Sequence, residues 1–244
     1  MDDLLELTGR VEAAHFWFRG FRAFVAPLLA EAAGPRQDMR LLDCGCGTGH
    51  NLAMLAPYGR AFGFDLTPGA LTLAQRSRRP LTRADVTRIP FQGDTFDLLT
   101  SFDVLQAVED DGLALREMAR VLRPGGTLIA SAAALRVLRG GHAAAWPEFR
   151  RYTRGSLHGV VEASGLKVER VTYVFGSLFP LLLAVRTLRR WMEADEPGED
   201  WEMNVPAAPL NAALTGMLRA EAAITRRVPF APAGSSVLVV ARKI

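Results

Sequence analysis

The chain is organised around residues 41–50, LLDCGCGTGH. The stretch begins with apolar residues typical of a buried strand, and glycine then occupies every second position, at Gly45, Gly47 and Gly49. Residues 51–56 follow with helical spacing. A Gly-rich turn between a strand and a helix lets a ligand approach the backbone closely, because no Cβ is in the way. The stretch therefore predicts a ligand-binding loop.

The residues around the glycines decide between ligands. A dinucleotide loop has the spacing G-x-G-x-x-G and places a pyrophosphate at the helix N-terminus. Here His50 stands where the third glycine should be, and Asp43 at the mouth of the loop would repel a pyrophosphate but attract an ammonium or sulfonium. The pattern D-x-G-x-G-x-G resembles the S-adenosylmethionine loop of class I methyltransferases, which makes Asp43, Gly45, Cys46 and Gly47 cofactor-binding candidates. A tight structural turn is the alternative.

Composition excludes several classes. The chain has 244 residues, 49% of them hydrophobic, which is enough for one large α/β domain or two small ones. The net charge is +3, and no Lys/Arg run with interleaved aromatics stands out, so we expect no nucleic-acid partner. The N-terminus is not signal-like, and no apolar run reaches the length of a membrane span, so the expected compartment is the cytoplasm.

The chain's only two cysteines, Cys44 and Cys46, both lie in the glycine loop. Metal binding at this spacing would need a second Cys or His pair, which the sequence lacks, and a disulfide two residues apart is strained. We therefore expect no metal and interpret both as small side chains beside a bound ligand.

Residues 2–33 have the pattern of one or two helices that end at residues 34–35, Gly-Pro. The aromatic cluster at 15–18 is too dense for one helix face. It either packs in the core or forms a lid over the cofactor. In the second case Trp17 supplies apolar cover, and Arg19 pairs with a carboxylate such as the one that S-adenosylmethionine carries.

Two further strands end in acids. Residues 60–65 end in Asp65, about twenty residues beyond the loop, where a carboxylate can accept from both ribose hydroxyls. Leu66 would then lie against the adenine. Asp85 and Val86 come at the end of a third predicted strand; the carboxylate could accept from the adenine amine and the valine could pack on the ring. A surface turn is the alternative for Asp85.

The following elements complete this half. Thr67 and Pro68 predict the N-cap and first position of a helix. In chain order we expect that helix to about residue 78, a buried strand at 96–102, a helix at about 110–122, a Pro-Gly-Gly turn at 123–126 and a strand at 127–131.

Five motifs therefore arrive in order: LLDCGCGTG, GFD, ADVTRIPF, FDLLTSFDVL and VLRPGGTL. Together they resemble a class I S-adenosylmethionine-dependent methyltransferase, of the broad group that includes the ubiquinone and menaquinone C-methyltransferases. The resemblance is close over about residues 38–131. It implies an α/β fold with a doubly wound, mostly parallel seven-stranded sheet (Rossmann-like), with the cofactor at the carboxyl ends of the first strands. We count Phe102, at the end of the fourth strand, with the cofactor-binding residues. Many members have His or Glu where this chain has Gln106, so a proton-abstracting role at that position is in doubt.

Residues 132–152 are irregular and lead into an Arg-Arg-Tyr-Thr stretch similar to one that borders the acceptor pocket in related methyltransferases. His142, Trp146 and Tyr152 are therefore acceptor-side candidates; a loop with a surface histidine is the alternative. If the reaction needs a general base, His15 and His142 are candidates and Tyr152 a weaker one.

The C-terminal part predicts a helix at about 154–164, ended by Gly165, and a strand at 167–174 that pairs antiparallel with a last strand at 236–242. Between them lies an insertion with an apolar run at 178–185, followed by Arg and Trp, and an Ala-rich helix at about 209–226. Segment 177–192 could contact a membrane or a lipid, or receive a greasy acceptor, but core packing or a dimer contact is the commoner use of such a segment. We predict a single domain divided into a lid (1–35), a cofactor-binding core with an acceptor-side loop (36–175), a helical insertion (176–235) and the last strand (236–244).

The resulting hypothesis is methyl transfer from S-adenosylmethionine to a small or lipophilic acceptor, leaving S-adenosylhomocysteine. The runner-up is a catalytically silent subunit that binds either compound for regulation or scaffolding. An NAD-type oxidoreductase is disfavoured by Asp43 and His50, and a nucleic-acid methyltransferase by the lack of an Asn/Asp-Pro-Pro-Tyr motif. The acceptor and the oligomeric state are left open.

Overall fold

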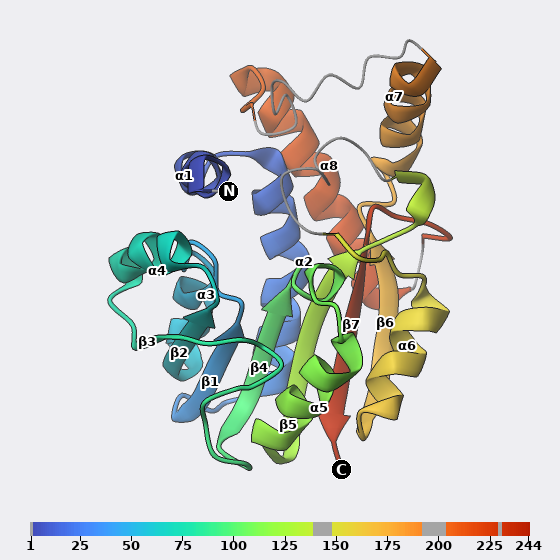
Figure 1. Cartoon of the computed structure of the whole chain (residues 1–244). Helices are drawn as coiled ribbons and strands as arrows, with labels where there is room; N and C mark the ends of the chain where they lie inside the picture. Colours follow the sequence, from blue (N-terminus) through green and yellow to red (C-terminus); the bar gives the residue numbers. More distant parts are fainter. Residues whose placement is uncertain (1, 139–147, 192–203, 229–230) are drawn as a thin grey trace.

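The computed structural model describes residues 2–138, 148–191, 204–228 and 231–244. A seven-stranded sheet with the order β3-β2-β1-β4-β5-β7-β6 forms its centre (Figure 1). The pairs among β1 to β5 are parallel, and β7 runs antiparallel to both its neighbours. The strands are β1 (Met39–Cys44), β2 (Gly59–Asp65), β3 (Leu81–Arg83), β4 (Phe96–Phe102), β5 (Leu122–Ala133), β6 (Leu166–Val174) and β7 (Ser236–Lys243).

Helices cover both faces of the sheet, so the predicted doubly wound architecture is confirmed. In chain order they are α1 (Asp2–Val11), α2 (Phe16–Ala33), α3 (Leu52–Leu55), α4 (Pro68–Ala74), α5 (Asp111–Val121), α6 (Arg154–Ala163), α7 (Phe179–Trp191) and α8 (Ala208–Arg227). One apolar cluster joins α5 and α6 to one face, and a second joins α2, α3 and α8 to the other.

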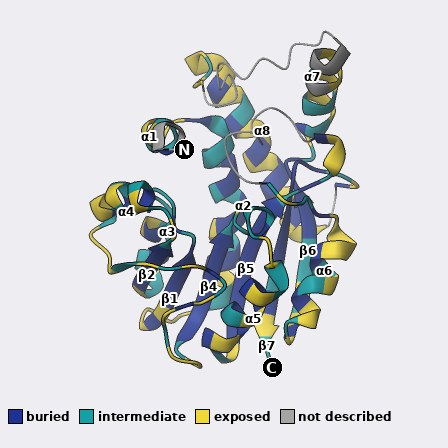
Figure 2. Ribbon diagram, in the orientation of Figure 1, coloured by how far each residue is buried: buried dark blue, intermediate teal, exposed yellow. Residues whose placement is uncertain are grey.

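The central strands are apolar on both sides, as a sheet covered by helices requires. Leu41 and Leu98 pack toward α2 and α8, whereas their neighbours Leu42 and Leu99 pack toward α5 and α6. Figure 2 shows the consequence: the strands are buried, and exposure is confined mainly to the outer faces of the helices and to the loops.

Several element boundaries differ from the sequence-based expectation. The helix expected to reach residue 78 ends at Ala74 and is followed by a short 3₁₀ turn and by Arg78 in a left-handed conformation. Strand β5 begins at Leu122 and not at residue 127, because Leu122 already pairs with Phe96 of β4. Strand β3 ends at Arg83, so Asp85 and Val86 lie in the loop beyond it.

The predicted helix of residues 154–164 and the antiparallel pairing of the last two strands are confirmed by α6 and by the β6–β7 register. The N-terminal region is two helices. His15 caps the second with its side chain, and Gly34 ends it.

The late helix α8 packs along α2, a contact that no sequence pattern predicted. A Cβ on Gly20 of α2 would lie 2.3 Å from Leu218 Cδ1, so glycine is what allows this close approach. Asn211 of α8 accepts a hydrogen bond from Phe16 N at 2.8 Å and donates one to Ala14 O at 2.9 Å. The inserted segment therefore anchors the turn between α1 and α2.

Candidate functional site

The glycine loop joins the carboxyl end of β1 to α3. Gly45 N and Cys46 N both donate to Phe64 O, at 2.9 and 2.8 Å, which fixes the loop beside β2. Its glycines have φ of 74°, 52° and 79° at Gly45, Gly47 and Gly49, a region that favours glycine. A Cβ on Gly45 would lie 2.4 Å from Val104, whereas one on Gly47 would meet nothing within 4 Å. The backbone is therefore accessible to a ligand over Gly47.

Asp43 lies beneath this loop and is 1% exposed. Its Oδ1 accepts a hydrogen bond from Thr100 Oγ1 at 2.7 Å, whereas its Oδ2 is buried and has no hydrogen-bond partner among the described residues. Burial raises the pKa of this carboxyl to about 7, against the opposing effect of the Thr100 hydrogen bond and with a further increase from the charge of Asp65. A buried carboxylate oxygen without a partner fits a cationic ligand beside the loop.

Asp65 ends β2 and faces the same loop. Its Oδ2 accepts from Gly47 N and its Oδ1 from Thr67 N, both at 2.9 Å. The next side chain, Leu66, is 57% exposed although it is large and apolar. A carboxylate beside an exposed apolar side chain is an arrangement that suits the ribose and the base of a nucleoside.

Asp85, Val86 and Phe102 complete the predicted cofactor set. Asp85 is exposed, but its Oδ1 accepts from both the N and the Oγ1 of Thr87 at 2.8 Å, so it closes its own turn. Val86 is 7% exposed. Phe102 is half-buried and meets the ring of Phe21 edge-on, with 5.0 Å between centroids.

The predicted lid reaches the sheet through Trp17, whose ring stacks on that of Phe175 at 4.1 Å between centroids. Phe175 is fully buried and follows β6 with φ 60°, an unusual conformation for a bulky residue. Arg19 is half-buried, and in the part of the chain that the structure describes it has no hydrogen-bonded acid.

The N-terminal segment also contacts the glycine loop directly, which the sequence did not reveal. Thr48 Oγ1 donates to the carboxylate of the buried Glu12, and His50 Nδ1 lies 3.0 Å from Glu12 Oε1. Burial raises the pKa of Glu12, and burial followed by the nearby Arg22 lowers the pKa of His50. Glu12 lies in an ordinary amphipathic pattern, so no local signal marks it.

Asp103 is a second residue that the sequence analysis missed. It follows β4 directly, has φ 56°, and its side chain is exposed at the carboxyl edge of the sheet. Its N donates to Ser131 O at 3.0 Å, and its Oδ1 accepts from the buried Ser131 Oγ at 3.3 Å. The sequence signal that could have identified Asp103 is its position directly after a buried strand.

Gln106 occupies the position where related sequences often have a base. Its Nε2 donates to Asp103 O at 2.9 Å and its Oε1 accepts from Ala133 N at 3.3 Å. The side chain therefore braces the loop after β4 against the end of β5.

The three base candidates have different surroundings. His15 is 2% exposed, its Nδ1 accepts from Trp17 N at 3.2 Å, and burial lowers its pKa. Tyr152 is 3% exposed and donates to Asp111 Oδ2 at 2.5 Å; burial and that carboxylate raise its pKa. Both sets of contacts support a structural role. His142, like Trp146, lies outside the described residues.

Both cysteines are free and buried. Burial raises the pKa of Cys46 and of Cys44. Within the described ranges, no group of three or more His, Cys, Asp or Glu residues is placed to hold a metal ion.

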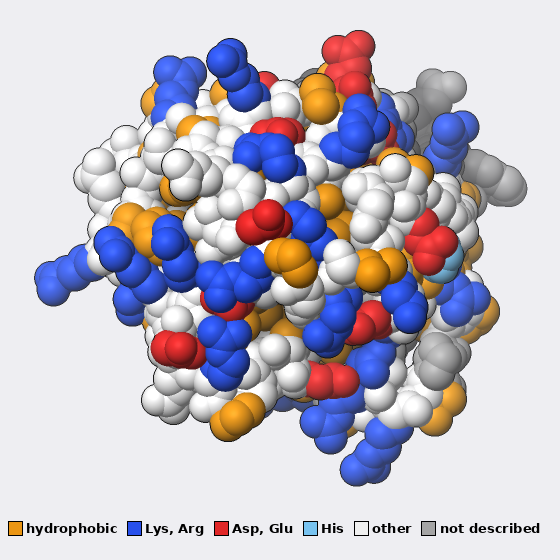
Figure 3. Space-filling model, turned by 90° about the horizontal axis from the view of Figure 1, so that it is seen from below, with side chains coloured by type: hydrophobic (Ala, Val, Ile, Leu, Met, Phe, Trp, Pro, Cys, Tyr) orange, Lys and Arg blue, Asp and Glu red, His pale blue; other side chains and the backbone are white. Residues whose placement is uncertain are grey.

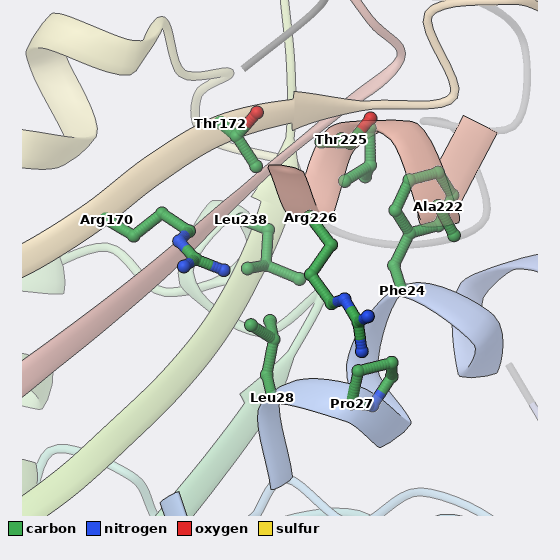
Figure 4. Close-up of a pocket in the computed structure, with 10 residues that line it drawn as sticks. Phe24, Pro27, Leu28, Arg170, Thr172, Ala222, Thr225, Arg226 and Leu238 are labelled. Carbon is green, nitrogen blue, oxygen red and sulfur yellow. The ribbon is translucent and has the colours of Figure 1, made fainter. Parts of the chain in front are cut away.

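A narrow pocket lies between α2, α8 and the last two strands (Figure 4). Phe24 and Leu28 line it from α2, and the guanidinium groups of Arg170 and Arg226 approach it from β6 and α8. Its volume is about 20 Å³, room for about one water molecule, so it cannot accept a substrate in this form.

The inserted helix α7 exposes apolar side chains. Leu181 and Leu188 are 58% and 59% exposed. The side chains of Arg186, Arg189, Arg190 and Trp191 are not among those described. A search of the described residues finds no helix both long enough and apolar enough to cross a membrane.

Comparison with known proteins adds independent information. Residues 42–130 match the family model for a methyltransferase domain. The demethylmenaquinone methyltransferase of Mycolicibacterium paratuberculosis is 40% identical over 97 residues, which cover 39% of this chain and 41% of that protein. Its namesake from Streptomyces avermitilis is 34% identical over 107 residues, 41% of this chain and 45% of that protein. The chain thus spans less than half the length of these curated relatives.

Solved structures share the fold over a longer stretch. A chain from the complex between the Haloferax volcanii Trm112 methyltransferase activator and a methyltransferase has a TM-score of 0.65 at 20% identity, covering 99% of this chain and 94% of that chain. The Haemonchus contortus phosphoethanolamine N-methyltransferase 2, solved with S-adenosyl-L-methionine, has a TM-score of 0.59 at 16% identity, covering 90% of this chain and 52% of that one.

The sheet order and the solved structures that share it define the class I methyltransferase fold, and residues 42–130 match a methyltransferase domain. Within that class the chain carries the methyltransferase domain over residues 42–130, and its curated relatives there are demethylmenaquinone methyltransferases. The resemblance predicted from the five motifs is confirmed.

Proposed function

We propose that this protein transfers a methyl group from S-adenosylmethionine to a small or lipophilic acceptor. The observation that carries the proposal is the buried Asp43 Oδ2, which has no hydrogen-bond partner within the described ranges and lies beneath a glycine loop that is open over Gly47. A cationic ligand over this loop would relieve the cost of a buried, unpaired carboxylate.

The described residues divide the binding of such a ligand between them. Asp43 would hold its positive end and Asp65 its ribose, in exchange for one or both of its present backbone partners. Leu66 and Val86 would cover the adenine, and Arg19 would pair with the carboxylate. When bound, S-adenosylmethionine supplies a methyl group already activated on a sulfonium.

The protein's remaining task is to align the acceptor and exclude water, which needs no covalent intermediate. Asp103 is the described carboxylate best placed to hold or accept a proton from the acceptor, because it is exposed at the carboxyl end of β4 beside Val104, which packs against Gly45. The hydrogen bond from Gln106 Nε2 to the backbone carbonyl oxygen of Asp103 keeps this loop in place.

The acceptor class is supported by two independent observations. The curated relatives are named for demethylmenaquinone, and the inserted helix α7 exposes Leu181 and Leu188. A lipophilic acceptor drawn from a membrane surface, with α7 as the contact, accounts for both.

The first test is calorimetric titration with S-adenosylmethionine and S-adenosylhomocysteine, followed by a methyl-transfer assay over quinol, phenol and amine acceptors. We expect micromolar binding and formation of S-adenosylhomocysteine with at least one lipophilic acceptor. Binding without turnover across the panel would favour the silent regulatory or scaffolding subunit, an alternative motivated by Gln106. Absence of binding would overturn both.

A further inference from the structure

A second pocket lies at the edge of the sheet opposite the glycine loop, where β4 and β5 begin and β7 ends. Its volume is about 200 Å³. Three arginines from separate parts of the chain line it: Arg36 between α2 and β1, Arg123 at the start of β5 and Arg242 near the end of β7. Figure 3 shows this edge from below, where Lys and Arg side chains outnumber Asp and Glu.

One buried carboxylate lies between two of these arginines. Asp97 has a 4% exposed side chain, and its Oδ1 accepts from Arg36 Nη1 at 2.7 Å and from Arg123 Nη1 at 2.8 Å. Its Oδ2 accepts from Arg40 N at 2.8 Å. Two guanidinium groups thus share one carboxylate oxygen, and this carboxylate does not occupy all the N–H donors of either group.

The other acids near the pocket lie at its rim. Asp38, whose side chain is 81% exposed, contacts Arg36 Nε at 3.2 Å, and Glu169, 39% exposed, contacts Arg242 Nε at 2.7 Å. Solvent-exposed pairs of this kind contribute only about 0–1 kcal/mol, so they compete weakly with a ligand of higher charge.

The N–H donors of the three arginines that have no acceptor indicate which ligand the pocket could bind. A guanidinium carries five N–H donors in a planar fork that matches phosphate oxygens. Arg36 Nη2, Arg123 Nε and Arg242 Nη2 have no acceptor in the portion of the chain that the structure describes. We propose that this pocket binds a phosphate or diphosphate group, at a site distinct from the methyl-transfer site at the opposite edge.

The experiment is calorimetric titration of the full chain with inorganic phosphate and with pyrophosphate at moderate salt. We expect saturable binding to one site, tighter for pyrophosphate because it carries more charge. Arg242→Gln and Arg36→Gln should each weaken it by at least about tenfold, since each removes hydrogen bonds to a charged group. Arg60→Gln is the matched control: Arg60 is exposed at the same edge, outside the pocket, with its guanidinium 5.0 Å from the Phe62 ring centroid.

A melting-temperature measurement guards against misfolded variants. Phosphate should raise the melting temperature of the wild type and of Arg60→Gln, but not that of Arg242→Gln. Failure to saturate at millimolar phosphate, or equal losses in Arg60→Gln and Arg242→Gln, would overturn the proposal. A second arm uses vesicles of phosphatidylglycerol: binding to vesicles without binding to free phosphate would assign the edge to a lipid headgroup and overturn the pocket as a site for a free phosphate.

Discussion

Thr48 Oγ1 lies 2.8 Å from both carboxylate oxygens of Glu12, so the turn after α1 is bonded to the glycine loop. His50 Nδ1 also lies 3.0 Å from Oε1 of Glu12. Because these loop residues flank the open backbone at Gly47, the position of the N-terminal helices and the conformation of the binding loop are physically linked.

The first prediction concerns this link. Thr48→Val keeps the shape of the side chain but removes the donor, which leaves the buried Glu12 carboxylate with the contact to His50 and the nearby charge of Arg22. We expect S-adenosylmethionine affinity to fall by about tenfold, in line with about 1–3 kcal/mol for an unsatisfied buried acceptor. Hydrogen exchange over residues 5–20 should also become faster.

Thr72→Val is the control for that prediction, because Thr72 is exposed on α4 and its Oγ1 donates to Pro68 O within the same helix. If Thr48→Val and Thr72→Val bind S-adenosylmethionine equally well, and hydrogen exchange in the N-terminal helices is unchanged, the contact between Glu12 and Thr48 does not affect cofactor binding.

The second prediction addresses Asp65. Asp65→Ala removes the acceptor of Gly47 N and the carboxylate proposed for the ribose. Each bond to a charged group contributes roughly 1.5–3 kcal/mol, so calorimetry should show affinity for S-adenosylmethionine reduced by at least tenfold. Glu162→Ala, an exposed acid on α6, should bind normally. Unchanged affinity in Asp65→Ala would remove Asp65 from the proposed site.

The predicted residues that the structure brings together share one property: each is adjacent to a strand end in a short local motif. Asp43, Gly47 and Asp65 are brought together because parallel strands end at the same edge of the sheet, which the motif order already implied. The fold itself was predictable for the same reason, since the apolar strands and glycine turns come in a fixed sequence.

The residues that the sequence missed act over long separations. Glu12 meets Thr48, and Asn211 meets Phe16, through the packing of helices whose own patterns are ordinary. Periodicity shows which face of α8 is apolar but not that Gly20 is its contact. The Arg36–Arg123–Arg242 pocket is equally non-local, because its three members come from three distant segments.

The third prediction tests the packing of α8 on α2. Gly20→Ala would favour an isolated helix by about 1 kcal/mol, but here the new Cβ would lie 2.3 Å from Leu218 Cδ1. We expect a net loss of about 1–3 kcal/mol in the free energy of unfolding, measured with urea. Leu218→Ala should relieve that clash, so the double variant should lose less than the two single variants together. A stabilised Gly20→Ala protein would show that the helices do not pack this closely.

The fourth prediction follows from the pKa of Asp43, which is raised to about 7 in the fold from an ordinary value of 3.8. The folded state holds this proton more tightly than the unfolded chain, so the ligand-free protein should be most stable below about pH 4 with respect to this group. That stability should be lost as the pH rises toward 7, by up to on the order of 4 kcal/mol.

Asp43→Asn keeps an oxygen that can accept the hydrogen bond from Thr100, and it cannot ionise. Its melting temperature should therefore exceed that of the wild type at pH 8 and not at pH 4. S-adenosylmethionine should reverse the order at pH 8, because only the wild type offers a carboxylate to its positive charge. Parallel melting curves for the two proteins from pH 4 to pH 8 would show that Asp43 does not carry the burial cost on which the proposed cofactor site rests.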